Sequence, residues 1–282
     1  MSVSVLRPLN EWSVASDASF SRRNVVAFDL DDTLTTRGEL HSSTLRALEE
    51  VGERGWTRVL VTGRSAGWVD AILKLLPFDG IVGENGALLA YWPQRRAGRK
   101  AREEPSKRYW TPQGYAAQPP TGLQDRFANA TREILRHVPR ARVASDQAFR
   151  LYDLAIDFAE EVDPPLGLED ARRIHSVFES LGAVAKISSI HVNGWWGAFS
   201  KSDGLRELLE NTWGGSLKDD LVYVGDSPND GPLFECTGLS VGVANVREFV
   251  GKTEFTLPRF VTRGEGGEGA RELLARLEAR SK

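Results

Sequence analysis

The sequence predicts an α/β fold in which a doubly wound parallel-sheet core carries an inserted α+β domain. Three observations predict it. Short apolar runs alternate with amphipathic stretches over residues 25–82, the alternation then stops, and it resumes after residue 201. Such alternation is typical of parallel strands that are joined by helices. The length of 282 residues also suits two domains, since one domain commonly has roughly 100–200 residues.

The first core segment opens with the strand Val25–Phe28, a continuous apolar run typical of a strand buried on both faces of a sheet. A helix is predicted over Ser43–Arg54, because apolar residues recur every three or four positions there and Gly55 follows as a stop. The other elements predicted in this segment are a strand at 59–61, a helix between 64 and 76, and a strand at 81–82.

The middle block lacks this alternation and is predicted to form the inserted domain. Its first part, residues 92–120, is rich in Pro, Gln, Gly and Arg, which predicts a long hairpin connection or flap. Its clustered basic residues are Arg95, Arg96, Arg99, Lys100, Arg102, Lys107 and Arg108. They have two interpretations, an ordinary solvated surface or a lid that faces the substrate. The other elements predicted are helices at 123–138 and 168–181, and strands at 151–158 and within 184–192.

The pattern of the core resumes from Lys201. The elements predicted there are a helix around 205–209, a strand at 221–224, a helical turn at 228–236, a strand at 239–243 and a final helix at 267–280. We therefore expect a core made of residues 24–86 and 196–282, interrupted by an inserted domain of residues 87–195. Residues 1–23 are expected to form an N-terminal extension on the surface, before the first strand.

The charge balance excludes a general nucleic-acid-binding surface. Thirty-nine acidic and 36 basic residues give a net charge of −3, whereas nucleic-acid-binding domains are usually basic. No apolar stretch approaches the ~20 residues that span a bilayer, and the first residues lack the apolar run of a secretory signal. The single cysteine, Cys236, fits a reducing compartment. We expect a cytoplasmic monomer or homodimer that binds neither nucleic acid nor membrane.

Acidic residues follow the first predicted strand, at the edge where open α/β sheets bind ligands. Asp29 and Asp31 are two positions apart, so their carboxylates point the same way if the strand conformation continues past Phe28. Two like charges at close range are unfavourable unless a cation accompanies them. A hard divalent ion with oxygen ligands, Mg²⁺ in particular, is the natural partner.

Three further motifs follow strands or open helices. Thr62-Gly63-Arg64 offers a hydroxyl and backbone N–H groups at a helix start, which is typical of an anion site. Lys201 precedes a predicted helix and supplies a fixed ammonium for phosphate oxygens. The segment Gly225–Asp230 adds more acids on a glycine turn. Each motif alone is common, but the four together and in this order form a strong signal.

These motifs resemble those of the haloacid-dehalogenase (HAD) superfamily of phosphohydrolases. Phe28–Leu34 is similar to the first motif, Val61–Arg64 to the second, Ser200-Lys201 to the third and Gly225–Asp230 to the fourth. Gly83–Ala87 resembles the turn into the inserted (type IIB) cap of the Cof-like, sucrose-phosphatase-like sugar phosphatase branch. The resemblance covers most of residues 24–86 and 196–260 at the level of motifs, and the middle block mainly by placement and size.

The resemblance implies a phosphatase that works through an aspartyl-phosphate intermediate. Asp29 would be the nucleophile, and Asp31 the general acid and then the general base. The paired acids favour phosphoryl transfer over dehalogenation, which keeps only the first Asp in this superfamily. The residues expected to bind the phosphoryl group are Thr62, Gly63 and Lys201. Those expected around Mg²⁺ are Asp29, the carbonyl of Asp31 and Asp226, with Asn229 and Asp230 as supporting residues.

The inserted domain would choose the rest of the substrate. Aromatic rings beside amide and hydroxyl groups suit a sugar, and Ser188–Lys201 resembles the return from cap to core in sucrose-phosphatases. The candidate specificity residues are Arg150, His191, Asn193 and Trp195, with Tyr152 and Trp196 beside them. Packing between cap and core is the other interpretation of the two tryptophans. Within the motifs, Asp32 is expected to point away from phosphate, and Arg64 to form a structural ion pair.

Three functions are consistent with these residues. The leading one is a Mg²⁺-dependent phosphatase of a small phosphorylated metabolite, either a sugar phosphate or a glycosyl-phosphoglycerate. A phosphomutase would share the same core but return the phosphoryl group to its substrate. A non-catalytic protein that binds a phosphorylated metabolite is the third, and the presence of both Asp29 and Asp31 argues against it.

Overall fold

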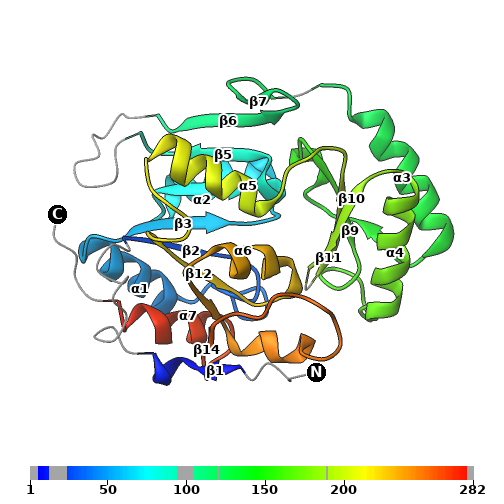
Figure 1. Ribbon diagram of the computed structural model, residues 1–282. Helices are drawn as coiled ribbons and strands as arrows, with labels where there is room; N and C mark the ends of the chain where they lie inside the picture. The colour runs from blue at the N-terminus through cyan, green and yellow to red at the C-terminus, as the bar shows by residue number, and fades with distance from the viewer. Residues whose placement is uncertain (1–5, 13–23, 94–103, 120, 189, 278–282) are drawn as a thin grey trace.

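The core of the protein is a ten-stranded sheet with helices on both faces (Figure 1). The computed structural model describes residues 6–12, 24–93, 104–119, 121–188 and 190–277. The strand order is β1-β14-β13-β12-β2-β3-β4-β5-β6-β7, in which the first seven strands are parallel and the last three antiparallel. A separate antiparallel sheet has the order β10-β11-β9-β8. The predicted α/β fold class is confirmed.

The element bounds match most of the expected segments. The core strands are β1 (Arg7–Pro8), β2 (Val25–Phe28), β3 (Thr57–Val61), β4 (Gly80–Gly83), β5 (Leu88–Tyr91), β6 (Ser106–Thr111), β7 (Gly114–Ala116), β12 (Leu221–Gly225), β13 (Leu239–Gly242) and β14 (Phe260–Val261). The core helices are α1 (Ser42–Glu53), α2 (Ala66–Leu75), α5 (Lys201–Arg206), α6 (Gly231–Cys236) and α7 (Gly266–Leu274). The second sheet and its helices comprise α3 (Gln124–His137), β8 (Arg142–Val143), β9 (Asp153–Asp157), α4 (Leu168–Ser180), β10 (Val184–Ile187) and β11 (His191–Trp195). No helix in these described stretches is both long and apolar enough to cross a membrane.

The central strands are buried on both faces, as their continuous apolar sequences predict. In β2, Val26 and Phe28 pack into one hydrophobic cluster with α1, α2 and α7, while Val25 and Ala27 pack into the other with α5 and α6. Successive side chains of a strand point to opposite faces, so both layers of helices are anchored on the same four residues. This arrangement fixes the carboxyl end of β2, where Asp29 follows.

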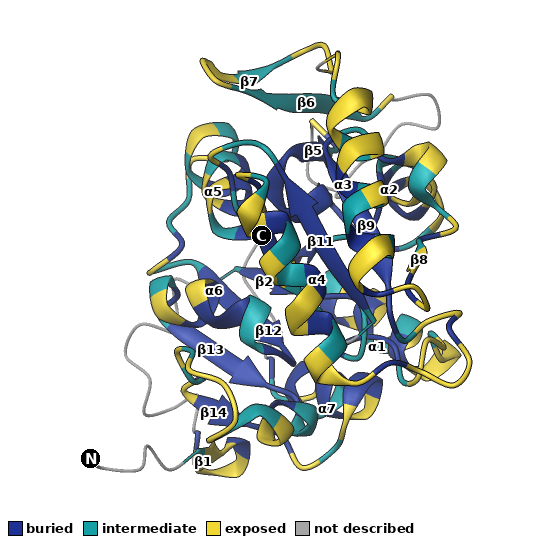
Figure 2. Ribbon diagram, turned by 90° about the vertical axis from the view of Figure 1, so that its right-hand side faces the viewer, coloured by how far each residue is buried: buried dark blue, intermediate teal, exposed yellow. Residues whose placement is uncertain are grey.

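Among the described residues, the smaller sheet is covered by helices on one face. Ala130 and Ile134 of α3 and Ile174 and Phe178 of α4 pack with β9 and β11 in a hydrophobic core of their own. Figure 2 shows the outer sides of these two helices exposed and the strands beneath them buried. The packing is close, because a Cβ on Gly194 in β11 would lie 2.2 Å from the Phe178 ring. The sheet therefore has one covered face, and its other face is available to the core.

Two segments differ from the sequence-based expectation. Residues 88–116, expected within the inserted domain, form β5, β6 and β7 and extend the core sheet. Residues 7–8, expected in a surface extension, pair with β14 at the opposite edge, and the neighbouring Leu9 and Trp12 are buried. The two additions extend the sheet at its two ends, and their pairing depends on partners elsewhere in the chain rather than on local periodicity. The basic residues 95, 96, 99, 100 and 102 lie outside the described residues, whereas Lys107 and Arg108 lie on β6.

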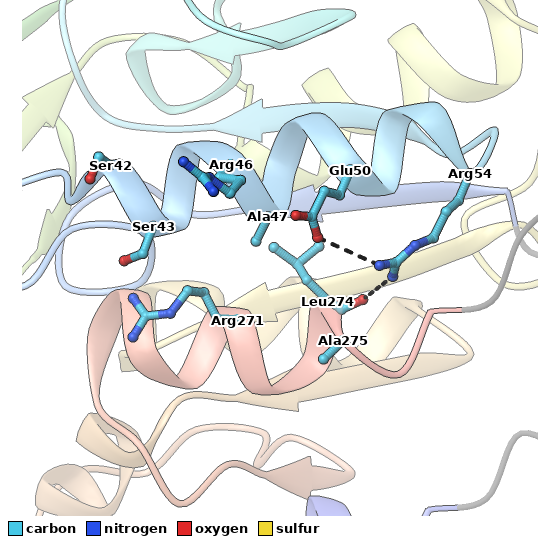
Figure 3. A pocket seen from close by; sticks show the side chains of 9 residues that line it. All are labelled: Ser42, Ser43, Arg46, Ala47, Glu50, Arg54, Arg271, Leu274 and Ala275. Atoms are coloured by element: carbon cyan, nitrogen blue, oxygen red, sulfur yellow. Dashed lines mark hydrogen bonds and ion pairs between the residues drawn. The ribbon is translucent and has the colours of Figure 1, made fainter.

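A groove between α1 and α7 lies on the face of the core that these helices cover (Figure 3). Arg54 crosses it and donates from Nη1 to the carbonyls of Leu274 and Leu277, each 3.2 Å away. Its Nη2 lies 3.6 Å from Glu50. A guanidinium on the last carbonyls of a helix satisfies groups that have no partner within the helix. This arginine therefore joins the two helices, and the groove is a structural seam.

The turn after β4 lies against the start of α5, and Gly86 allows that approach. A Cβ on Gly86 would lie 1.9 Å from the carbonyl oxygen of Ser200, and the residue has φ +112°. We expect Gly86→Ala to cost at least about 2 kcal/mol of unfolding free energy, from overpacking and the unfavourable φ. The matched control is Gly114→Ala, since Gly114 has φ +113° with nothing within 4 Å. Thermal melts that show equal losses for both variants would contradict the role of the contact.

Candidate active site

The four sequence motifs meet at one edge of the sheet. Strands β13, β12, β2 and β3 are neighbours and parallel, so the residues after them, Asp226, Asp29 and Thr62, emerge side by side. Lys201, the first residue of α5, reaches the same place. The cavity there is lined from the core by Asp29, Asp31, Gly63, Arg64, Asn85, Lys201, Asp226, Ser227 and Asn229, and from the smaller domain by Arg150, Ser188, Ile190, His191 and Asn193. Ligand binding at this edge is the general behaviour of open α/β sheets.

A buried ammonium sits among buried carboxylates at the centre of the site. Lys201 Nζ lies 2.5 Å from Asp29 Oδ1 and 3.4 Å from Asp230 Oδ1. Burial raises the pKa of Asp29 to about 7, although Lys201 opposes the shift. Burial, with Asp230 and Asp29 nearby, raises the pKa of Asp226 well above its usual range. The single ammonium of Lys201 therefore does not balance the negative charge that Asp29, Asp226 and Asp230 would carry if all three were ionised.

The donor set fits a hard divalent cation. Carboxylate oxygens of Asp29, Asp226 and Asp230 all lie within 4.8 Å of one another, and all three side chains are buried. Oxygen ligands are what Mg²⁺ prefers, and a cation would favour the ionised forms that burial alone disfavours. The residues present therefore fit the metal that the resemblance implies.

Asp230 is held by protein donors on both of its oxygens. Oδ1 accepts from the Tyr223 hydroxyl at 2.6 Å, while Oδ2 accepts from the backbone N–H groups of Asp226 at 3.0 Å and Ser227 at 3.2 Å. A carboxylate used in this way orients its neighbours and has little capacity left for an ion. Its bonding agrees with the supporting role expected for it, and the role itself stays a prediction. Asn229 lines the cavity beside it.

Arg64 forms an ion pair, but inside the site. Its Nε and Nη2 donate to the two carboxylate oxygens of Asp31 at 3.0 and 2.8 Å, and Nη2 also donates to Glu160 Oε1 at 2.8 Å. Glu160 Oε2 lies 2.9 Å from His191 Nε2. His191 and Arg64 together lower the pKa of Glu160 to about 2, against the opposite effect of burial. A chain of charges thus joins Asp31, the expected general acid, to the smaller domain.

The turn after β3 has an internal hydrogen bond that orients it. Thr62 Oγ1 accepts from the backbone N–H of Arg64 at 3.0 Å; Thr62 itself is buried and does not line the cavity, whereas Gly63 does, so phosphate contact by the threonine hydroxyl stays a prediction. Gly63 leaves room for Asn85, because a Cβ there would lie 3.0 Å from Asn85 Oδ1. The turn therefore has the groups that an anion site needs, at the start of α2.

The candidate specificity residues divide into two groups. Arg150, His191 and Asn193 line the cavity. Trp195 does not line it and instead stacks on Phe199 at 5.5 Å, in a hydrophobic cluster between the domains. This placement favours the packing interpretation for Trp195. Substrate contact by His191 and Asn193 stays a prediction.

Sequence reasoning missed two residues that take part in the site. Asn85 lies in the Gly83–Ala87 turn, which drew attention only as an entry to the inserted domain, yet its side chain reaches the cavity. Glu160 follows β9 and pairs with Arg64 across the domains. An acid two residues after a predicted strand was the available signal for Glu160. Asp32 does not line the cavity and has φ +55°, consistent with a turn away from it.

Comparisons with known proteins agree with this geometry. Residues 26–100 match the family model of haloacid dehalogenase-like hydrolases. A phosphoglycolate phosphatase of Methanopyrus kandleri is 25% identical over 260 residues, which covers 90% of this chain and 97% of that protein. Another from Methanosarcina acetivorans is 36% identical over 80 residues, or 28% of this chain and 33% of that protein.

Solved structures share the fold along most of the chain. Thermoplasma acidophilum 0175 has a TM-score of 0.64 at 17% identity, covering 90% of this chain and 98% of that one. The sucrose-phosphatase of a Synechocystis species, solved with sucrose and phosphate, has a TM-score of 0.56 at 18% identity, covering 91% and 98%. The matched model and the relative of similar length agree that the chain is similar to the haloacid dehalogenase-like hydrolases, and the solved structures show that it shares their fold.

Proposed function

We propose that this chain is a Mg²⁺-dependent phosphatase that hydrolyses a small phosphorylated metabolite through an aspartyl-phosphate on Asp29. The chain is a phosphoric monoester hydrolase, the class to which its named relatives belong. The observation that carries the proposal is the buried Lys201 ammonium 2.5 Å from Asp29, with Asp226 and Asp230 beside them. Such a cluster is costly to bury unless it binds a cation and an anion together.

The chemistry follows from the positions of the side chains. A carboxylate oxygen of Asp29 attacks phosphorus, the bond to the leaving oxygen breaks, and Asp31 gives that oxygen a proton. Water, deprotonated by Asp31, then attacks the phosphoryl group and releases Asp29 and inorganic phosphate. Lys201, the Thr62 hydroxyl and the Gly63 N–H hold the phosphoryl oxygens throughout.

A cation completes this charge balance. Asp29, Asp226 and the carbonyl of Asp31 would hold Mg²⁺, which supplies positive charge against a phosphoryl oxygen. Asp230 supports the arrangement by orienting the backbone of Asp226, because its Oδ2 accepts a hydrogen bond from the Asp226 N–H at 3.0 Å.

The inserted domain acts as a cap on this site. Residues 24–86 and 196–282 form the catalytic core in this proposal, and β5–β7 belong with it because they pair with its sheet. The cap's own fold then runs from Gln124 to Trp195. The cavity between cap and core is about 20 Å³, room for about one water molecule. Substrate entry therefore requires movement, and the partly exposed Arg64–Glu160 pair is the contact best able to break.

Two substrate classes follow from different observations. Polar cap residues in the cavity, His191 and Asn193, support a sugar phosphate or glycosyl-phosphoglycerate. The names of the relatives support phosphoglycolate, a smaller ester that carries a carboxylate. We propose that the protein works in the cytoplasm, because a single cysteine fits a reducing compartment. We propose a monomer or homodimer as its active form.

A panel of phosphorylated metabolites tests this function. We expect phosphate release from p-nitrophenyl phosphate and much faster release from one of the metabolites, with phosphoglycolate, hexose phosphates and glycosyl-phosphoglycerates all included. Transfer of the phosphoryl group between positions without net release would instead indicate a mutase. No phosphate release from any ester in the presence of Mg²⁺ would overturn the proposal.

A further inference from the structure

The cap contributes one fully buried arginine to the base of the site. Arg150 has a side chain that is 0% exposed, and it pairs with Asp153, also 0% exposed, at 2.9 Å. Its Nε and Nη2 donate to the two oxygens of Asp146 at 2.9 and 3.2 Å. Four of the five N–H donors of this guanidinium are engaged once its bond to Gly63 is included. Little capacity therefore remains for a substrate.

The bond from Arg150 to the core reaches the turn proposed to bind phosphate. Nη1 donates to the carbonyl oxygen of Gly63 at 2.8 Å. The N–H of the same peptide unit, on Arg64, donates to Thr62 Oγ1 at 3.0 Å. Both polar ends of the Gly63–Arg64 peptide are thus fixed, one from the cap and one from the core. A planar peptide held at both ends cannot rotate, so the Thr62 hydroxyl keeps its orientation.

Asp153 extends this unit to both sides of the interface between the domains. Its Oδ2 accepts from Asn85 Nδ2 of the core at 2.9 Å and from Asn193 Nδ2 of the cap at 2.8 Å. The carboxylate of Glu84, next to Asn85, accepts from the backbone N–H groups of Leu151 and Tyr152. The cap segment around Arg150 is consequently locked onto the turn that follows β4.

We propose that Arg150 is a positioning residue by which the cap sets the geometry of the phosphate-binding turn. The proposal rests on the proposed function, because it assigns the Thr62-Gly63 turn to phosphate. It replaces the substrate contact expected for Arg150. The phosphate site is therefore complete only with the cap docked, although no cap atom in this network touches the phosphoryl group.

A matched pair of variants separates positioning from mere stability. Arg58 forms a similar buried unit in the core, with Nε and Nη2 on Asp79 at 3.0 and 3.1 Å and Nη1 on the Leu48 carbonyl at 3.3 Å. It does not line the active-site cavity. Arg150→Lys and Arg58→Lys each keep the positive charge and lose the planar fork. Both are therefore expected to lower the melting temperature.

The main measurement is the inhibition constant of inorganic phosphate for the hydrolysis of p-nitrophenyl phosphate, with Mg²⁺ present. The kcat, the KM and the melting temperature of each variant are measured as well. We expect Arg150→Lys to raise the inhibition constant by roughly tenfold and to lower kcat, while Arg58→Lys stays within twofold of the wild type. If Arg150→Lys has a lowered melting temperature but an inhibition constant within twofold of the wild type, the positioning role of Arg150 is wrong. The proposed phosphatase function is not affected by that result.

A milder variant covers the case in which Arg150→Lys does not fold. Asp146→Asn weakens the hold on Nε and Nη2 but leaves the bond to Gly63 possible, and it should raise the inhibition constant less, in the same direction. An unchanged constant in this variant counts against positioning. A wild type that neither releases phosphate nor is inhibited by it would overturn the proposed function and this inference with it.

Discussion

Asp29→Asn should lower phosphate release at least about a thousandfold and leave the fold intact. The amide cannot form the phosphoryl ester, so the first bond of the proposed reaction is lost. Stability should change little, since the substitution removes a buried carboxylate that is unfavourable beside Asp226 and Asp230 but also deprives Lys201 of its partner at 2.5 Å. Phosphate release from p-nitrophenyl phosphate and circular-dichroism melts measure the two effects.

The control for this variant is the same substitution outside the site. Asp70 on α2 pairs with Lys74 and Lys107 near the surface, and Asp70→Asn should leave turnover unchanged. Acid quenching during turnover should trap a phosphoryl group on the wild-type peptide that contains Asp29, and none on the variant. Turnover of Asp29→Asn within tenfold of the wild type would falsify the assignment of the nucleophile.

Much of the core could be predicted because its signals are local. The run Val25–Phe28 is apolar at every position, and a strand buried by helices on both faces requires this. The motifs then follow from topology, since residues after neighbouring parallel strands emerge at one edge. Asp29, Thr62 and Asp226 could be brought together in this way without any coordinates.

The missed parts depend on partners far away in the chain. Strands β5 and β6 looked like part of the insertion, because nothing in Leu88–Tyr91 tells which sheet it will join. Short polar-flanked strands have weak intrinsic preferences, and pairing decides their place. The N-terminal strand β1 was missed for the same reason, since it pairs with β14, about 250 positions later in the chain.

The side-chain network of the site was equally out of reach. Arg64 and Asp31 both belong to recognised motifs, but their bidentate pairing depends on how two turns face each other. Arg150 was expected to contact the substrate, and nothing local predicts its burial, because a lone arginine in an inserted domain is usually solvated. Its guanidinium can be buried because Asp146 and Asp153 balance its positive charge. The residues that couple the domains thus became visible only in three dimensions.

Removal of divalent metal should abolish turnover and lower the melting temperature. Burial raises the pKa of Asp29 to about 7 and that of Asp226 well above its usual range, so the site without a cation favours protonated carboxyl groups. A bound cation stabilises the folded chain by about 2.7 kcal/mol at a hundredfold excess over its Kd, and each kcal/mol moves the Tm by about 2–4 °C in domains of roughly 150–250 residues. Mg²⁺ added after chelation should therefore restore activity and raise the Tm by several degrees.

Asp226→Asn distinguishes the stabilisation that comes from a cation bound at this site from nonspecific effects of Mg²⁺ or chelator on the protein. The variant keeps the Thr33 neighbour and the backbone bond to Asp230, but it loses one charged ligand. Without metal, its Tm should equal or exceed that of the wild type, because one buried charge is gone. With Mg²⁺, its Tm should stay flat while the wild type rises, and Asp70→Asn should follow the wild type. If chelated wild-type enzyme keeps full activity and its Tm ignores Mg²⁺, then Asp226 does not hold a catalytic cation, and the buried carboxylates must be balanced by protons and Lys201 alone.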